Sequence, residues 1–201
     1  MPSAIWLITY DLDPAREAEY LAWFHDIHIP EKLARPGYTW AAHYRADSGR
    51  HVALFGGAAT RIFYDPSPAQ LAPKQPPETR DMMSCRQNPA MAILAGEWTA
   101  DASGTFTGDG QPVHSPAIVL AECDPGSDAA SDMDFSAWLV QDYLPALTQA
   151  EGFQSLHKLV ASTGTPRHTL IHEFQAGQAP TLAFGDHIRA TSLTATRLWP
   201  E

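Results

Sequence analysis

Two side chains of this sequence have the type and position needed to move a proton. His28 follows an apolar segment with helical spacing, so we expect its imidazole at the edge of a buried helix face. Partial removal from water lowers an imidazole pKa and keeps the ring a neutral base near pH 7. In a second, similar segment Asp142 takes the place of Ile27, and a buried aspartate needs either a cavity or a partner such as Tyr143 or Lys158. His28 and Asp142 therefore predict a general acid/base site.

Each of these residues also has a purely structural interpretation. His28 can be a capping or core-edge histidine, and Asp142 can belong to a structural ion pair. Tyrosines near a base can orient it or donate to an oxyanion, and we name Tyr44 and Tyr143 for that role. The side chains that we expect to bind substrate are Trp6, Tyr10, Trp23, Trp40, His43 and His172. Aromatic and strand residues of this kind more often lie in a core or in a cross-strand pair.

The sequence contains no motif for a metal or a cofactor. His25 and His28 have the spacing of two helical metal ligands, but no motif supplies a third ligand, so we predict no metal site. A phosphate-binding glycine loop, a nucleophile elbow and a dinucleotide fingerprint are all missing. We therefore expect chemistry without a cofactor.

The composition is that of a folded, acidic protein. Hydrophobic residues make up 44% of the 201 residues, which is enough for a packed core. The formal net charge of −10 repels phosphate backbones, so we exclude nucleic acid as a partner. We expect no membrane span and no signal peptide, which predicts a cytoplasmic location. The two cysteines, Cys85 and Cys123, are expected to be free thiols.

An internal repeat organises the chain. Residues 22–38 align without a gap with residues 137–153. The shared positions are Trp23 and Trp138, Pro30 and Pro145, and Gly37 and Gly152. Between the copies the sequence is rich in Gly, Ser, Thr and Asp, which is typical of a linker. We therefore divide the chain into a first copy at 1–99, a linker at 100–116 and a degenerate second copy at 117–201.

The two copies have the same predicted order of elements. In the first copy we expect strands at 4–10, 38–46, 51–55 and 91–98. In the second copy we expect strands at 117–122, 153–161, 168–174 and 192–199. Residues 58–90 are the least regular part, with a further strand at 61–64 and a helix over about 78–87, and the matching stretch at 177–187 is shorter.

A helix is predicted after the first strand of each copy. Asp13 and Asp132 are the expected N-caps, and Pro30 and Pro145 mark the positions where these helices end or kink. The apolar face of the first helix is predicted to consist of Tyr20, Trp23, Phe24 and Ile27. The order strand, helix, strand, strand, helix, strand is that of a ferredoxin-like unit. Because two such units can cover each other's sheets, we predict an α+β fold of two tandem ferredoxin-like units.

One string in the first copy carries a family resemblance. It comprises Glu19-Tyr20, Trp23-Phe24, His28-Ile29-Pro30-Glu31, Leu33, Pro36-Gly37 and His43-Tyr44. It resembles the EthD-like branch of the dimeric α/β-barrel superfamily over residues 4–55, and the second copy does so weakly over 117–175. The resemblance implies an intrachain pseudo-dimer of the dimeric-α/β-barrel type and a catalytic role for His28. The acidic residue that often precedes the family's histidine is Ile27 here, whereas the second copy has Asp142.

Three functions follow as hypotheses. The first is a cofactor-free acid/base enzyme of the isomerase, cyclase or lyase type, which acts on a small apolar or aromatic carbonyl compound and uses His28 to shuttle the proton. The second is a non-catalytic module that binds a small hydrophobic molecule or pairs as a homodimer. The third, which the resemblance allows, is a haem protein with His157 or His172 as axial ligand, although no spacing of residues supports it.

Overall fold

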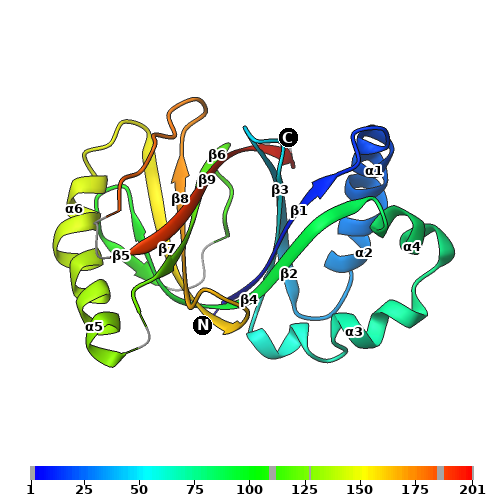
Figure 1. The fold of residues 1–201 in the computed structure, drawn as a ribbon, viewed down its shortest axis with the longest axis horizontal. Coiled ribbons are helices and arrows are strands. Elements are labelled where there is room, and N and C mark those ends of the chain that lie inside the picture. The colour runs from blue at the N-terminus through cyan, green and yellow to red at the C-terminus, as the bar shows by residue number, and fades with distance from the viewer. Residues whose placement is uncertain (1–2, 109–111, 127, 185–187, 201) are drawn as a thin grey trace.

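An antiparallel barrel forms the centre of the computed structural model, which describes residues 3–108, 112–126, 128–184 and 188–200. Among these residues, eight strands close the barrel and helices pack on its outside (Figure 1). The first half contributes β1 (Ala4–Leu12), β2 (Tyr38–Ala46), β3 (His51–Gly57) and β4 (Arg86–Asp101). The second half contributes β6 (Ala117–Asp124), β7 (Phe153–Thr163), β8 (His168–Phe174) and β9 (Arg189–Trp199). The eight strands predicted for the two repeats are confirmed, and the last strand of each half begins earlier than expected.

Each half forms a ferredoxin-like sheet. The strand order is β4-β1-β3-β2 in the first half and β9-β6-β8-β7 in the second. Two pairings join the sheets: β4 with β7, where Leu94 lies opposite Ala161, and β2 with β9, where Tyr44 lies opposite Arg197. These pairings occupy the edges of both sheets, so each of the eight barrel strands has at least two neighbours. The predicted α+β fold of two ferredoxin-like units in one chain is confirmed.

Alternation along the strands separates the interior of the barrel from two helix–sheet layers. On β1, Ile5 and Leu7 point into the barrel, whereas Trp6 and Ile8 point outwards to the helices of the first half. The outer face of the second sheet packs on its own helices around Phe135. The chain therefore has two separate layers, one in each half, in which a site can form.

One helical segment covers the outer face of each sheet (Figure 1). In the first half it consists of α1 (Glu17–Trp23), a π-helical turn (Phe24–His28) and α2 (Ile29–Leu33). In the second half it consists of α5 (Ala129–Trp138), a π-helical turn (Leu139–Tyr143) and α6 (Leu144–Leu147). Pro30 and Pro145 do not end these segments, because each proline follows the π-helical turn and the helix continues beyond it.

The π-helical turn decides which residues face the sheet. The N–H of Ile29 donates to the carbonyl of Phe24, five residues earlier. This wider turn makes room for the ring of the following proline, which would clash with the carbonyl four residues before it in a regular α-helix. The turn contains one extra residue, so the inward position moves from 27 to 28. Ile27 is 40% exposed and His28 is 5% exposed, so the prediction that Ile27 lies on the apolar face is wrong.

The predicted N-caps are also wrong. α1 begins at Glu17, and Asp13 instead accepts a hydrogen bond within the preceding turn. α5 is capped by Asp128, which has extended backbone angles and accepts from the N–H of Ser131 at 2.9 Å. Asp132 lies inside the helix. Aspartates four residues apart both fit the sequence pattern of a cap, and only the backbone conformation distinguishes them.

Short helices, not a strand, follow β3. A 3₁₀ turn (Thr60–Phe63) replaces the strand predicted at 61–64, and α3 (Pro68–Leu71), a second 3₁₀ turn (Ala72–Lys74) and α4 (Pro77–Met83) come next. The predicted helix at 78–87 exists but is shorter, because β4 already begins at residue 86. In the corresponding part of the second half the described residues, 177–184, contain no helix, and residues 185–187 lie outside the described part.

The predicted linker is partly a strand. β4 extends to Asp101, and β5 (Phe106–Gly108) pairs with its end. Residues 109–111 of the linker lie outside the described part of the chain. Both cysteines are buried free thiols, as expected. None of the described helices has the length and hydropathy to span a bilayer.

Gly56 in β3 is a position at which any side chain would collide with the barrel core. A Cβ atom there would lie 2.0 Å from Nε1 of Trp40. We expect Gly56→Ala to displace this indole and to lower the free energy of unfolding, measured with urea, by about 1–3 kcal/mol. In a Trp40→Leu background the same change should cost little, because the smaller side chain leaves room. Equal losses in both backgrounds would show that the indole is not the cause.

Candidate functional site

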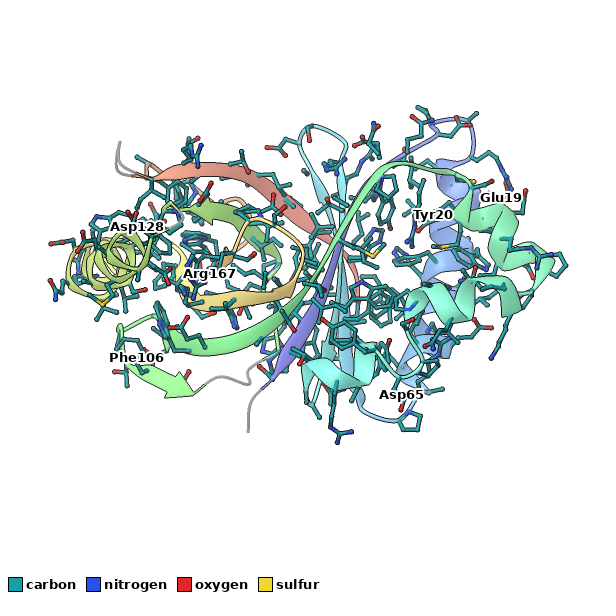
Figure 2. The ribbon with its side chains drawn as sticks, turned by 60° about the horizontal axis from the view of Figure 1, so that its bottom comes forward. Glu19, Tyr20, Asp65, Phe106, Asp128 and Arg167 are labelled. Atoms are coloured by element: carbon teal, nitrogen blue, oxygen red, sulfur yellow. The ribbon has the colours of Figure 1, made fainter. Side chains whose placement is uncertain are left out.

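A cavity of about 510 Å³ lies in the helix–sheet layer of the first half. It is bounded by the outer face of β1 and β4, by α2, and by α3 with the 3₁₀ turn that follows it. Figure 2, in which Tyr20 of α1 is labelled, shows the side chains between this helix and the barrel. The apolar lining of the cavity includes Trp6, Ile8, Leu71, Ala72, Met83 and Met91. Its titratable lining residues are His28, Lys32 and Arg86.

His28 presents an uncharged imidazole to this cavity. Its ring lies 4.7 Å from the ring of Trp23 and stacks on Phe24 at 5.5 Å, measured between centroids. Burial, and then the positive charges of Lys32 and Arg86, lowers the pKa of His28 to about 2. Its Nδ1 atom is enclosed and has no hydrogen-bond partner. The ring therefore remains neutral at every physiological pH and retains unused hydrogen-bonding capacity.

Lys32 lies four residues after His28 and is buried without an acidic partner. Its side chain is 4% exposed, and Nζ lies 4.9 Å from the centroid of the Trp6 indole. Among the described residues it has no hydrogen bond or ion pair. Burial, and then the charges of Arg35 and Arg86, lowers the pKa of Lys32 to about 7. This amine therefore changes its charge near neutral pH, which an exposed lysine does not do.

The guanidinium of Arg86 is the second cationic group at the cavity. It lies 4.3 Å from the ring centroid of Tyr10, and Nε donates to the hydroxyl of Tyr20 at 2.7 Å. Its Nη2 atom is buried and has no partner. Two enclosed tyrosines thus fix the guanidinium, while N–H groups of Nη2 remain unused for an oxygen of a ligand.

The site is positive although the protein is acidic. A smaller cavity of about 100 Å³ shares Lys32 with the larger one and adds Arg35 and Lys74 to the lining. Together with Arg86, four cations line the two cavities, and Glu31 is the one carboxylate among the described lining residues. Positive charge in a cleft with low-dielectric walls attracts anions. The arrangement suits a ligand with an apolar body and a negatively charged or strongly polar oxygen.

Asp142 does not belong to this cavity. It lies in the helical segment of the second half, on the opposite side of the barrel (Figure 1), and its side chain is exposed. The π-helical turn has the same effect as in the first half, because it turns position 142 outwards and position 143 towards the sheet. The expectation of a buried carboxylate paired with His28 is therefore wrong.

Tyr143, the counterpart of His28 in the repeat, contacts His172 in the second half. The Tyr143 hydroxyl lies 2.9 Å from Nε2 of His172, and Nδ1 of His172 lies 2.9 Å from the carbonyl oxygen of Val119. The ring of Phe184 stacks on Tyr143 with centroids 5.7 Å apart. These contacts lie in the layer that corresponds to the cavity of the first half. The structure thus brings Tyr143 and His172 together, but far from His28.

The remaining predicted aromatic residues divide between two faces of the first sheet. Trp6 lines the cavity, and Tyr10 and Trp23 pack behind it in the same layer. Trp40 and Tyr44 belong to the interior of the barrel, because alternation along β2 directs them away from the helices. Tyr44 therefore cannot contact a ligand in this cavity.

His43 belongs to a buried chain of histidines beside the cavity layer. Its Nδ1 lies 2.8 Å from Nε2 of His25, and its Nε2 lies 3.2 Å from Nδ1 of His51, which approaches Glu17 at 3.4 Å. Burial lowers the pKa of both His43 and His51. His25 is thus bound to His43 and does not join His28 as a metal ligand. In the second half Asp132 on the helix contacts His168 on β8, and His168 contacts Lys158 on β7. This arrangement corresponds to Glu17, His51 and His43 in the first half.

Sequence reasoning missed Lys32 and Arg86 as site residues. The signal for Lys32 was present, because a residue four positions after His28 falls on the same helix face. Arg86 had no such signal, since it lies at the end of a segment without regular periodicity. Only the pairing of β1 with β4 brings Arg86 beside Tyr10 and the cavity.

His157 and His172 do not fit the role of an axial haem ligand. Both ring nitrogens of His172 are engaged, by Tyr143 and Val119. His157 likewise contacts Glu173 through Nε2 at 2.7 Å and Thr99 through Nδ1 at 3.3 Å. An axial ligand needs one ring nitrogen that is free to face the iron.

The chain matches no family model and no curated protein, but it resembles solved structures over nearly its full length. A candidate chlorite dismutase has a TM-score of 0.62 at 10% identity, with 98% of this chain and 95% of that chain covered. A candidate monooxygenase of Fusobacterium nucleatum has a TM-score of 0.61 at 7% identity, with 98% and 92% covered. An anthrone oxidase-like protein has a TM-score of 0.57 at 10% identity, with 98% and 91% covered. These similarities establish the fold that the chain shares with them, and the EthD-like resemblance stays a prediction.

The buried amine of Lys32 should reduce the stability of the fold. Its pKa is about 7 in the folded chain and 10.5 for the ordinary side chain, so the unfolded state binds the proton more readily between these values. The loss of folding stability caused by the buried amine grows as pH falls from 10.5 to 7 and is constant below pH 7. We expect Lys32→Met to raise the free energy of unfolding at pH 7 by roughly 2–4 kcal/mol, and by much less above pH 10.

Urea unfolding at the two pH values measures this effect. Lys74→Met is the matched control, because Lys74 is exposed and its replacement should change stability little. A loss of stability in Lys32→Met at pH 7 would mean that the amine is favourably solvated in the folded state.

Proposed function

We propose that the chain is a cofactor-free enzyme that removes a proton next to the carbonyl group of a small apolar or aromatic compound, as isomerases, cyclases and lyases do. The observation that carries the proposal is the cavity of the first half, which sets a neutral imidazole and two cations around apolar space. The indole of Trp6 and the side chains of Ile8 and Met91 offer an apolar surface for the body of the substrate.

Arg86 and Lys32 supply positive charge for the carbonyl oxygen. When a proton leaves the neighbouring carbon, negative charge develops on this oxygen. Nη2 of Arg86 has no partner, and Nζ of Lys32 forms no hydrogen bond or ion pair with a described residue, so both groups can face a ligand oxygen. In an apolar cavity such charges act more strongly than in water.

His28 is the group that takes the proton. Its pKa is low because the ring is buried beside cations. A substrate oxygen that becomes negative offsets these cations, and the affinity of the ring for a proton then rises during the step that needs it. The neighbouring rings of Trp23 and Phe24 hold the imidazole in place.

Exchange of the methyl protons of acetophenone for deuterium, followed by NMR in D₂O, tests this function. We expect the protein to catalyse the exchange and His28→Phe to reduce it by about 100-fold or more, because the phenyl ring keeps the packing but cannot carry a proton. Tyr143→Phe is the matched control at the corresponding position of the second half, and it should leave the exchange unchanged.

The same experiment distinguishes the rival functions. Binding of acetophenone without exchange in the unmodified protein would identify a non-catalytic binding module. A Soret band after addition of haem that disappears in His28→Phe would identify a haem site and overturn the cofactor-free proposal. Full exchange in His28→Phe would remove His28 from its role.

A further inference from the structure

We propose that Lys32 is the nucleophile of a covalent site, and that its amine condenses with the carbonyl carbon of an apolar oxo acid to form an imine. This inference rests on the proposed function and deepens it. It names the class of substrate, an aldehyde or ketone that also carries a carboxylate, and it gives Lys32 a bond to the substrate in place of a charge contact with its oxygen.

The surroundings of the three lysines single out Lys32. Lys74 is exposed, and Lys158 is buried but donates to Glu97 at 2.5 Å and lies 2.9 Å from Nδ1 of His168. Lys32 is also buried, yet it forms no hydrogen bond or ion pair with a described residue, and it lines both cavities. A buried amine that is not held by an acid keeps its lone pair available once it loses its proton.

Positive groups surround this amine from each element packed against it. On its own helical segment Arg35 is the positive group, Glu31 is the opposing charge, and the uncharged His28 lies beside them. Arg86 approaches from β4 and Lys74 from the 3₁₀ turn that follows α3. Burial and these cations lower the pKa of Lys32 to about 7, so a large fraction of the chains carries the free amine at neutral pH.

The other cations of the two cavities indicate that the substrate carries a negatively charged group in addition to its carbonyl. Once Lys32 is bonded to the carbonyl carbon, Arg35, Lys74 and Arg86 still line the two cavities. Their charge is offset by one described carboxylate, so an acidic group on the ligand would complete the balance. The apolar residues between them, such as Trp6 and Leu71, require a hydrocarbon or aromatic body.

The covalent step is balanced without an oxidant or reductant. The lone pair of Nζ forms a bond to the carbonyl carbon, the carbon–oxygen π bond breaks, and the oxygen takes a proton. The nitrogen then loses one proton, the hydroxyl takes a second proton and leaves as water, and a protonated carbon–nitrogen double bond remains. Protonated, this imine attracts electrons from the neighbouring carbon, and His28 one turn earlier can take the proton that leaves there.

Reductive trapping of the imine tests the inference. We expect 4-formylbenzoate and sodium cyanoborohydride to attach one reduced adduct to the full chain at pH 7, and peptide mapping to locate it at Lys32. The trapping rate should rise as pH increases through 7, because the free amine is the reactive form. Competition by 4-(hydroxymethyl)benzoate, which lacks the carbonyl, and slower labelling by benzaldehyde, which lacks the carboxylate, should confirm binding in the cavity.

Two variants provide the controls. Lys32→Arg keeps a positive charge but should abolish the adduct, whereas Tyr143→Phe, in the second half and outside the lining of both cavities, should leave it unchanged. An adduct that persists in Lys32→Arg, or that is spread evenly over Lys74 and the α-amino group, would overturn the inference.

The two proposals fail separately. Exchange of acetophenone that depends on His28, without trapping at Lys32, would overturn the covalent site and leave the proposed function intact. Trapping at Lys32 without exchange of the methyl protons of 4-acetylbenzoate, which carries both the ketone and the carboxylate, would support the covalent site and overturn proton abstraction as the function.

Discussion

The rest of the structure depends on one constraint, the π-helical turn that precedes a proline in each half. The two prolines, Pro30 and Pro145, occupy equivalent positions of the repeat. A proline ring cannot be placed in a regular helix without a clash, and one additional residue in the turn relieves it. The same residue rotates the inward face by one position. As a result the imidazole of His28 and the phenol of Tyr143 face their sheets, while Ile27 and Asp142 face outwards.

The two halves have the same fold, but their equivalent positions carry side chains with different partners. In the second half the inward phenol is bonded to His172 and packed by Phe184, and the strand lysine Lys158 is paired with Glu97. In the first half the inward imidazole has an unsatisfied nitrogen, and Lys32 has no acid. Unpaired polar groups in an enclosed layer cost stability, so their concentration around one cavity is a signature of function more than of folding.

The sequence predicted the scaffold better than the site. Strand alternation and the repeat predicted the ferredoxin-like halves, because these follow from local periodicity. They did not show that β2 directs Trp40 and Tyr44 into the barrel, away from the site to which both were assigned. Helical periodicity placed His28 only at the edge of the buried face, because a wheel of 3.6 residues per turn contains no π-helical turn. The same wheel placed Asp142 in the interior. Arg86 reaches the cavity through its strand pairing with Leu12, 74 residues earlier, which no local pattern reveals.

Covalent continuity between the halves has a consequence for the solution behaviour of the site. β4 runs from the cavity, where Arg86 and Met91 lie, into its pairing with β7 of the other half. A barrel assembled from two separate chains comes apart on dilution, and it presents two equivalent sites that can influence each other. Here the two sheets belong to one chain, so dilution does not separate them and the cavity of the first half keeps the strand that supports it.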